Sequence, residues 1–186
     1  MHLEKKVQHN SFLKAQGVTL RFVEETDADF IVRIRTDNKL GQHISSTSNE
    51  IEDQVKWIKE YKKREKAGTE YYFIFEDSEQ NDWGTVRLYN FSGKKFTIGS
   101  WICLPNNKDN IAIKAWLLCV QYGFEVLNFD ILQFDIRKKN TAVLLYANMY
   151  KPQKVDEDEL NYFFELEKAA FYKNREKVIQ LLKIQM

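Results

Sequence analysis

The sequence is poor in the residues that crosslink or interrupt a polypeptide. Its 186 residues include two cysteines, two prolines and seven glycines. Two cysteines cannot build the disulfide framework of a small secreted domain, so we expect Cys103 and Cys119 to be free thiols in a reducing compartment. No repeat or low-complexity stretch marks a linker, and a chain of this length is predicted to form one domain.

Charge of one sign and long hydrophobic runs are also lacking. Lys and Arg number 28 against 27 Asp and Glu, so the bulk charge attracts neither nucleic acid nor anionic lipid. No apolar run approaches the length of a membrane span, and the opening MHLEKKVQHN is too polar for a secretory signal. We therefore expect a cytoplasmic protein without nucleic-acid or membrane partners, in which any anion site is local.

What the chain does have is an apolar fraction of 44% and a pattern of alternating elements. Residues 1–17 carry little pattern and are expected to form a polar arm, followed by one domain over 18–186. Apolar periodicity predicts strands at 18–23, 70–77, 83–91, 95–104, 130–138 and 159–167, and helices at 26–37, 49–67, 111–127, 140–150 and after 167. This order predicts an α/β domain with a mixed sheet and helices on both faces.

The stretch WICLPNNKDNIAIKAWLL, residues 101–118, joins an apolar strand through a polar loop to the start of a helix. Helix N-termini leave amides without partners and favour negative charge, so such a junction can hold a phosphate. The loop has no glycine, but asparagine is the best substitute for left-handed backbone, and Asn106, Asn107 and Asn110 are present. Lys108 adds a positive charge; an asparagine-rich turn without a ligand is the alternative interpretation.

Two longer stretches bring a known family into view. VTLRFVEETDADFIVRIR (18–35) and YGFEVLNFDILQFDIRKKNTAVLLY (122–146), in this order of elements, resemble the GNAT N-acetyltransferases. The resemblance covers residue 18 to about 167. It implies a single-domain, mostly antiparallel mixed sheet flanked by helices, with two strands splayed apart to bind acetyl-CoA and no metal. EYYFIFED, GTVRLYNF, IGSWICLP and DELNYFFEL look most like a bacterial group that acetylates amino groups of nucleotide-linked sugars.

The resemblance places the cosubstrate acetyl-CoA on this loop and on the strand before it. Backbone amides at the start of the helix would bind the pyrophosphate, and main-chain groups of the splayed strand would bind the pantetheine arm. The residues expected to contact the cofactor are Trp101, Ile102, Cys103, Asn107, Lys108, Asn110, Ile111, Ala112 and Asn140.

The helix expected to carry the catalytic acid departs from the family's pattern. In the family, a tyrosine seven residues after the asparagine protonates the departing thiolate, but here that position is Ala147. Tyr146 lies about 100° around the helix on an apolar stripe, so it is either a core residue or a displaced proton donor. Asp135 and Glu24 are candidate bases, although direct attack by a partly neutral amine needs neither.

The acceptor is expected to be a small-molecule amine, and a nucleotide-linked amino sugar is favoured. His43, Arg87 and Tyr89 are expected to contact its sugar hydroxyls or a nucleotide phosphate. Two alternatives stay open: an acetyltransferase acting on peptide or protein N-termini, and a GNAT-fold module that binds coenzyme A without efficient catalysis. The oligomeric state is also open between a monomer and a homodimer.

Overall fold

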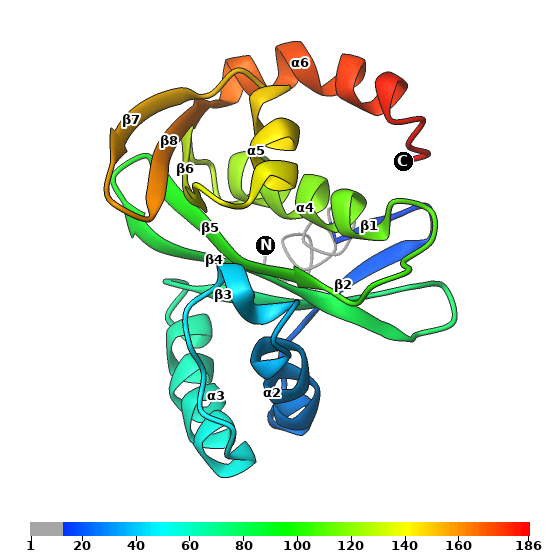
Figure 1. The fold of residues 1–186 in the computed structure, drawn as a ribbon, viewed down its shortest axis with the longest axis vertical. Coiled ribbons are helices and arrows are strands. Elements are labelled where there is room, and N and C mark those ends of the chain that lie inside the picture. Colours follow the sequence, from blue (N-terminus) through cyan, green and yellow to red (C-terminus); the bar gives the residue numbers. More distant parts are fainter. Residues whose placement is uncertain (1–12) are drawn as a thin grey trace, which may run out of the picture.

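The computed structural model describes residues 13–186 and contains an eight-stranded sheet of order β1-β2-β3-β4-β5-β6-β8-β7 (Figure 1). Neighbouring strands are antiparallel except β5 and β6, which run parallel. The strands are β1 (Lys14–Ala15), β2 (Val18–Phe22), β3 (Tyr71–Glu76), β4 (Asp82–Ser92), β5 (Lys95–Cys103), β6 (Ile131–Arg137), β7 (Gln153–Glu157) and β8 (Asn161–Glu167). The predicted mostly antiparallel mixed sheet is confirmed.

Helices cover both faces of the sheet (Figure 1). One face carries α2 (Ala28–Thr36) and α3 (Ile51–Lys66); the other carries α4 (Ile111–Gln121), α5 (Thr141–Asn148) and α6 (Lys168–Leu181). Short 3₁₀ turns lie at Glu25–Asp27 and Gly41–His43, and a π-helical turn, Tyr122–Val126, extends α4. No helix within residues 13–186 is long and apolar enough to cross a membrane.

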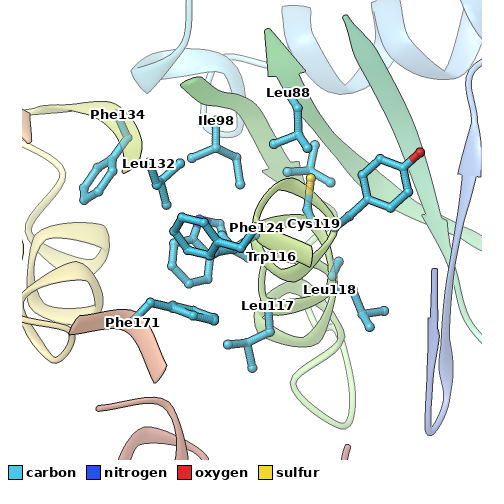
Figure 2. Packing of buried hydrophobic residues seen from close by; sticks show 14 of the residues in the cluster. Leu88, Ile98, Trp116, Leu117, Leu118, Cys119, Phe124, Leu132, Phe134 and Phe171 are labelled. Carbon is cyan, nitrogen blue, oxygen red and sulfur yellow. The ribbon is translucent and has the colours of Figure 1, made fainter. Parts of the chain in front are cut away.

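Strand alternation divides the core into two clusters. Tyr72 and Ile74 of β3 pack with α2 and α3, whereas Phe73 and Phe75 face α4. Helix α4 is apolar on nearly all sides because it lies between the sheet and α6, as expected for a helix buried all round. Figure 2 shows its residues Trp116 to Cys119 among side chains of the sheet and Phe171 of α6.

Two edge strands were missing from the sequence prediction. Lys14 and Ala15 pair with Thr19 and Val18, so the predicted arm of residues 1–17 ends earlier than expected; its residues 1–12 lie outside the described residues. Strand β7 is exposed along its whole length. Backbone hydrogen bonds to one neighbour hold each of these strands, and neither needs the apolar alternation that reveals a half-buried strand.

The feature that positions the functional site is the divergence of β5 from β6. The two strands pair only from Lys95 to Thr97 on β5. Beyond Thr97, β5 stays with β4 through a bulge, where Ser100 has a φ of 50°, and β6 stays with β8 as far as Arg137. The predicted splayed pair is therefore present, and it opens at the carboxyl ends of both strands.

Candidate active site

A cavity of about 670 Å³ occupies the opening between β5 and β6. Its wall combines both splayed strands with residues from α4, α5 and the segment after α2. Many of the residues predicted from the sequence line it together: His43, Arg87, Tyr89, Trp101, Ile102, Cys103, Asp135, Asn140 and Tyr146. The fold thus gathers positions from His43 to Tyr146, more than a hundred residues apart, into one site.

The polar side of the cavity lies on the sheet face that carries α2 and α3. Arg87 places its guanidinium carbon 4.3 Å from the Tyr89 ring centroid and its Nη1 3.4 Å from Oε1 of Glu70. Asp135 lies on β6 between Phe134 and Ile136, which pack in the core cluster on the α4 side of the sheet. Strand alternation therefore turns Asp135 toward the face that carries α2 and α3. The carboxylate of Asp135 has no ion-pair partner within residues 13–186, and burial raises its pKa above the usual value. A carboxylate so placed can accept a proton from an amine in the cavity.

The apolar side is formed by β5 and the helices above it. The Trp101 indole packs 6.2 Å from the Trp116 ring, and its Nε1 donates to the carbonyl of Ala112 (3.1 Å), which fixes the start of α4 against β5. Burial raises the pKa of Cys103 to about 12, so this thiol stays neutral and is no nucleophile at pH 7. Asn140 caps α5 by accepting from the Val143 amide (3.3 Å), as its sequence position predicts.

The glycine-free loop adopts the left-handed backbone that its asparagines predicted. Asn106 and Asn110 have φ of 58° and 56°, and Asp109 joins them at 57°. Asn107 does not adopt this conformation. The predicted residues of this segment (Asn107, Lys108, Asn110, Ile111 and Ala112) follow the end of β5 and do not line the cavity.

The first turn of α4 leaves backbone donors available beside this loop. The Ile111 amide donates to Lys108 (3.2 Å) and that of Lys114 to Asn110 (3.0 Å). Within the described part of the chain, no acceptor pairs with the amides of Ala112 and Ile113. Free amides at a helix N-terminus beside a lysine suit a phosphate.

Tyr146 is a packed residue at the cavity wall. It is 8% exposed, its ring centroid lies 5.2 Å from that of Trp116, and its hydroxyl lies 3.2 Å from that of Tyr150. Burial raises its pKa well above 10. These contacts favour the core interpretation, and the role of Tyr146 as proton donor stays a prediction.

The position of Glu24 does not support its predicted role as a base. Glu24 follows β2, and two strands, β3 and β4, separate β2 from the splayed β5. Its carboxylate accepts from Nζ of Lys62 (2.9 Å), and it does not line the cavity. Sequence alone could not reveal this, because the strand order places the end of the first strand far from the opening.

Sequence reasoning also missed residues that line the cavity. Arg137 and Asn161 lie opposite each other on β6 and β8. Arg137 is two residues after Asp135 on the same strand, and this period-two spacing could have indicated it. Asn161 could not be found this way, because its position depends on the register of β8. Within residues 13–186, no cluster of His, Cys, Asp and Glu could hold a metal ion.

Comparison with known proteins agrees with this geometry. A family model described as the acetyltransferase (GNAT) domain matches residues 18–145. The structure of apo FdhC, described as a nucleotide-linked sugar GNAT, is similar at 38% identity and a TM-score of 0.80, over 89% of this chain and 94% of that one. No curated protein sequence matches.

Two more distant structures share the fold alone. Spermidine N-acetyltransferase from Vibrio cholerae, in complex with CoA and spermine, is 15% identical with a TM-score of 0.72, over 84% of this chain and 98% of that one. Mycobacterium smegmatis RimJ, in complex with CoA-disulfide, is 13% identical with a TM-score of 0.74, over 91% of each chain.

Proposed function

The chain belongs to the GNAT acetyltransferase family, and from this premise we propose that it transfers the acetyl group of acetyl-CoA to the amine of a nucleotide-linked amino sugar. The observation that carries the proposal is the cavity between β5 and β6, which joins an apolar side to a polar side holding Asp135. The 38% identity to a nucleotide-linked sugar GNAT supports the choice of acceptor.

Acetyl-CoA supplies a thioester whose acyl carbon accepts a nucleophile. We assign its pyrophosphate to the amides of Ala112 and Ile113, with Lys108 adding charge, because these donors lack partners within the described residues. We assign its pantetheine arm to the edge of β5 from Trp101 to Cys103, since no strand among residues 13–186 pairs with β5 on that side beyond Thr97. Asn140 lines the same cavity.

The chemistry follows from the placement of Asp135. The acceptor nitrogen forms a bond to the acyl carbon, and the carbon–sulfur bond breaks with its electron pair on sulfur. Asp135 takes the proton that the nitrogen loses, and coenzyme A leaves as a thiolate that takes a proton from solvent. Its pKa, raised by burial, makes it a stronger base than an ordinary aspartate. His43, Arg87 and Tyr89 surround the acceptor with hydrogen-bond donors, so that positioning contributes alongside base catalysis.

Release of free coenzyme A thiol with a matched set of acceptors tests this proposal. The set contains a nucleotide-linked amino sugar, the same amino sugar without its nucleotide, spermidine, and a peptide with a free N-terminus. We expect the nucleotide-linked amino sugar to give the highest kcat/KM. A preference for the peptide would move the function to N-terminal acetylation. Binding of acetyl-CoA without turnover of any acceptor would indicate the module that has lost efficient catalysis.

A further inference from the structure

A second cavity, of about 370 Å³, adjoins the first on the sheet face that carries α2 and α3. It lies between the segment of residues 45–48, the first turns of α3 and the strands β3 and β4. Ser45, Arg87 and Ser100 line both cavities. One elongated ligand can therefore occupy the two cavities together.

Arg35 brings a positive charge to this second cavity. Its guanidinium donates to the Thr47 hydroxyl (2.5 Å), to the carbonyl and hydroxyl of Ser45 (3.1 and 3.0 Å), and to the Ser100 hydroxyl (3.4 Å). All these acceptors are neutral, and within the part of the chain that the structure describes no carboxylate forms an ion pair with Arg35. A guanidinium held in this way is oriented but keeps its full attraction for an anion.

Two residues that line the same cavity each carry a buried polar atom without a hydrogen-bond partner among residues 13–186. Tyr72 is 2% exposed, and neither its hydroxyl nor Nε of Arg87 has a hydrogen-bond partner among residues 13–186. An unpaired buried donor destabilises the folded state, so such groups in a folded protein call for an explanation. Both residues line the cavity, so a ligand with several acceptor oxygens can pair with these groups when the two side chains turn toward it.

The charges around the cavity favour an anion of phosphate type. Asp53 lines it, but the Ser48 hydroxyl (3.0 Å) and Nζ of Lys56 (3.3 Å) both donate to that carboxylate. Glu70, beside Arg87, is also shared with Arg64 at 2.7 Å. Arginine forks combined with serine and threonine hydroxyls match the several oxygens of a phosphate better than the two of a carboxylate.

We propose that this second cavity binds the diphosphate of a nucleoside diphosphate, with Arg35 as its main contact. The proposal deepens the proposed function and rests on it only for the identity of the acceptor. With the diphosphate at Arg35, the sugar passes Arg87, and its amine reaches Asp135 in the larger cavity. Arg35 would then determine specificity for a nucleotide-linked over a free amino sugar.

Calorimetric titration with uridine diphosphate, thymidine diphosphate and inorganic pyrophosphate tests the assignment. We expect Arg35→Gln to weaken nucleoside diphosphate binding by at least about tenfold, since hydrogen bonds to charged groups are the strong ones. Arg33→Gln is the matched control: it removes an exposed arginine on the same helix that lines neither cavity. Asn110→Asp, at the start of α4, reports binding at the coenzyme A loop instead.

Arg35→Gln also removes the hydrogen bonds that hold residues 45–48, and loosening of this segment alone would weaken binding. A second variant separates that effect from the loss of charge. Asp53→Asn removes from the cavity a negative charge that repels the diphosphate, and it should tighten diphosphate binding by about two- to fivefold. Disorder of residues 45–48 would not tighten binding. The proposal is overturned if wild-type protein binds no nucleoside diphosphate, if Arg35→Gln binds as wild type does, or if Asn110→Asp alone weakens binding.

Turnover separates this inference from the proposed function. If diphosphate binding depends on Arg35 but no nucleotide-linked amino sugar is acetylated, the proposed function fails and the cavity assignment stands. If nucleotide-linked amino sugars are acetylated and Arg35→Gln leaves their KM unchanged, the cavity assignment fails and the proposed function stands. We expect Arg35→Gln to raise that KM and to leave the KM for acetyl-CoA unchanged.

Discussion

At the scale of single residues, the account depends most on Asp135. Among the described residues it is the carboxylate that lines the larger cavity, and it faces the polar side without an ion-pair partner. Burial disfavours its charged form and so raises its pKa. Groups perturbed in this way and placed in a cavity are frequent in active sites, because proton transfer needs a base that differs from an ordinary surface carboxylate.

Asp135→Asn should lower kcat/KM by about 10²–10⁴ without loss of stability at pH 7. A carboxyl group with a raised folded-state pKa stabilises the protein when protonated, and that stability is lost as pH rises through the folded-state value. The asparagine variant escapes the loss, so its melting temperature at pH 7 should equal or exceed that of wild type. Below the ordinary aspartate pKa the difference should vanish. Thermal unfolding and steady-state rates across pH measure both effects; wild-type turnover by the variant would exclude Asp135 as base.

Tyr146→Phe separates the two interpretations of the displaced tyrosine. The ring keeps its contacts with Trp101 and Trp116, and the variant loses only the hydroxyl beside Tyr150. We expect kcat near that of wild type and a decrease of about 0.5–1.5 kcal/mol in the free energy of unfolding. If kcat instead drops more than about a hundredfold in a folded variant, with an unchanged KM for acetyl-CoA, Tyr146 is the proton donor.

At the scale of elements, the loop before α4 shows how asparagine and aspartate take the place of glycine in a left-handed backbone. Asn106, Asp109 and Asn110 take the left-handed backbone that glycine would otherwise supply. The helix that follows begins with the amides of Ala112 and Ile113 unpaired within the described residues. The strand before this loop also helps to form the site, because β5 diverges from β6 after three paired residues and leaves an edge of β5 open.

Asn110→Asp should weaken coenzyme A binding by about tenfold while leaving the fold intact. Aspartate tolerates the left-handed backbone, and its charge interacts favourably with the helix N-terminus, so the melting temperature should be unchanged or higher. The same charge repels a pyrophosphate at this position. Calorimetry measures the affinity, and Asn110→Gly, which keeps the backbone conformation without adding charge, is the control. Equal affinity in wild type and Asn110→Asp would place the pyrophosphate elsewhere.

At the scale of the whole molecule, sequence patterns predicted the elements that bury an apolar face in the core. The central strands and the helices followed from apolar periodicity, and the splayed pair followed from the resemblance. The edge strands β1 and β7 escaped because main-chain pairing alone defines them. Glu24, a candidate base, lies outside the cavity, and Arg35 was overlooked, for a related reason: strand order and the folding of residues 45–48 onto α2 are tertiary properties.

The measurement that tests the central claim most directly compares two acceptors that differ in one group. A nucleotide-linked amino sugar and the matching nucleotide sugar with a hydroxyl in place of the amine are each incubated with acetyl-CoA, and the products are analysed by mass spectrometry. The account predicts one acetyl group on the amino sugar, localised to its nitrogen, with an equal amount of coenzyme A released and no reaction of the hydroxyl analogue. Failure to acetylate the amino sugar, or equal reaction of both acceptors, would contradict it.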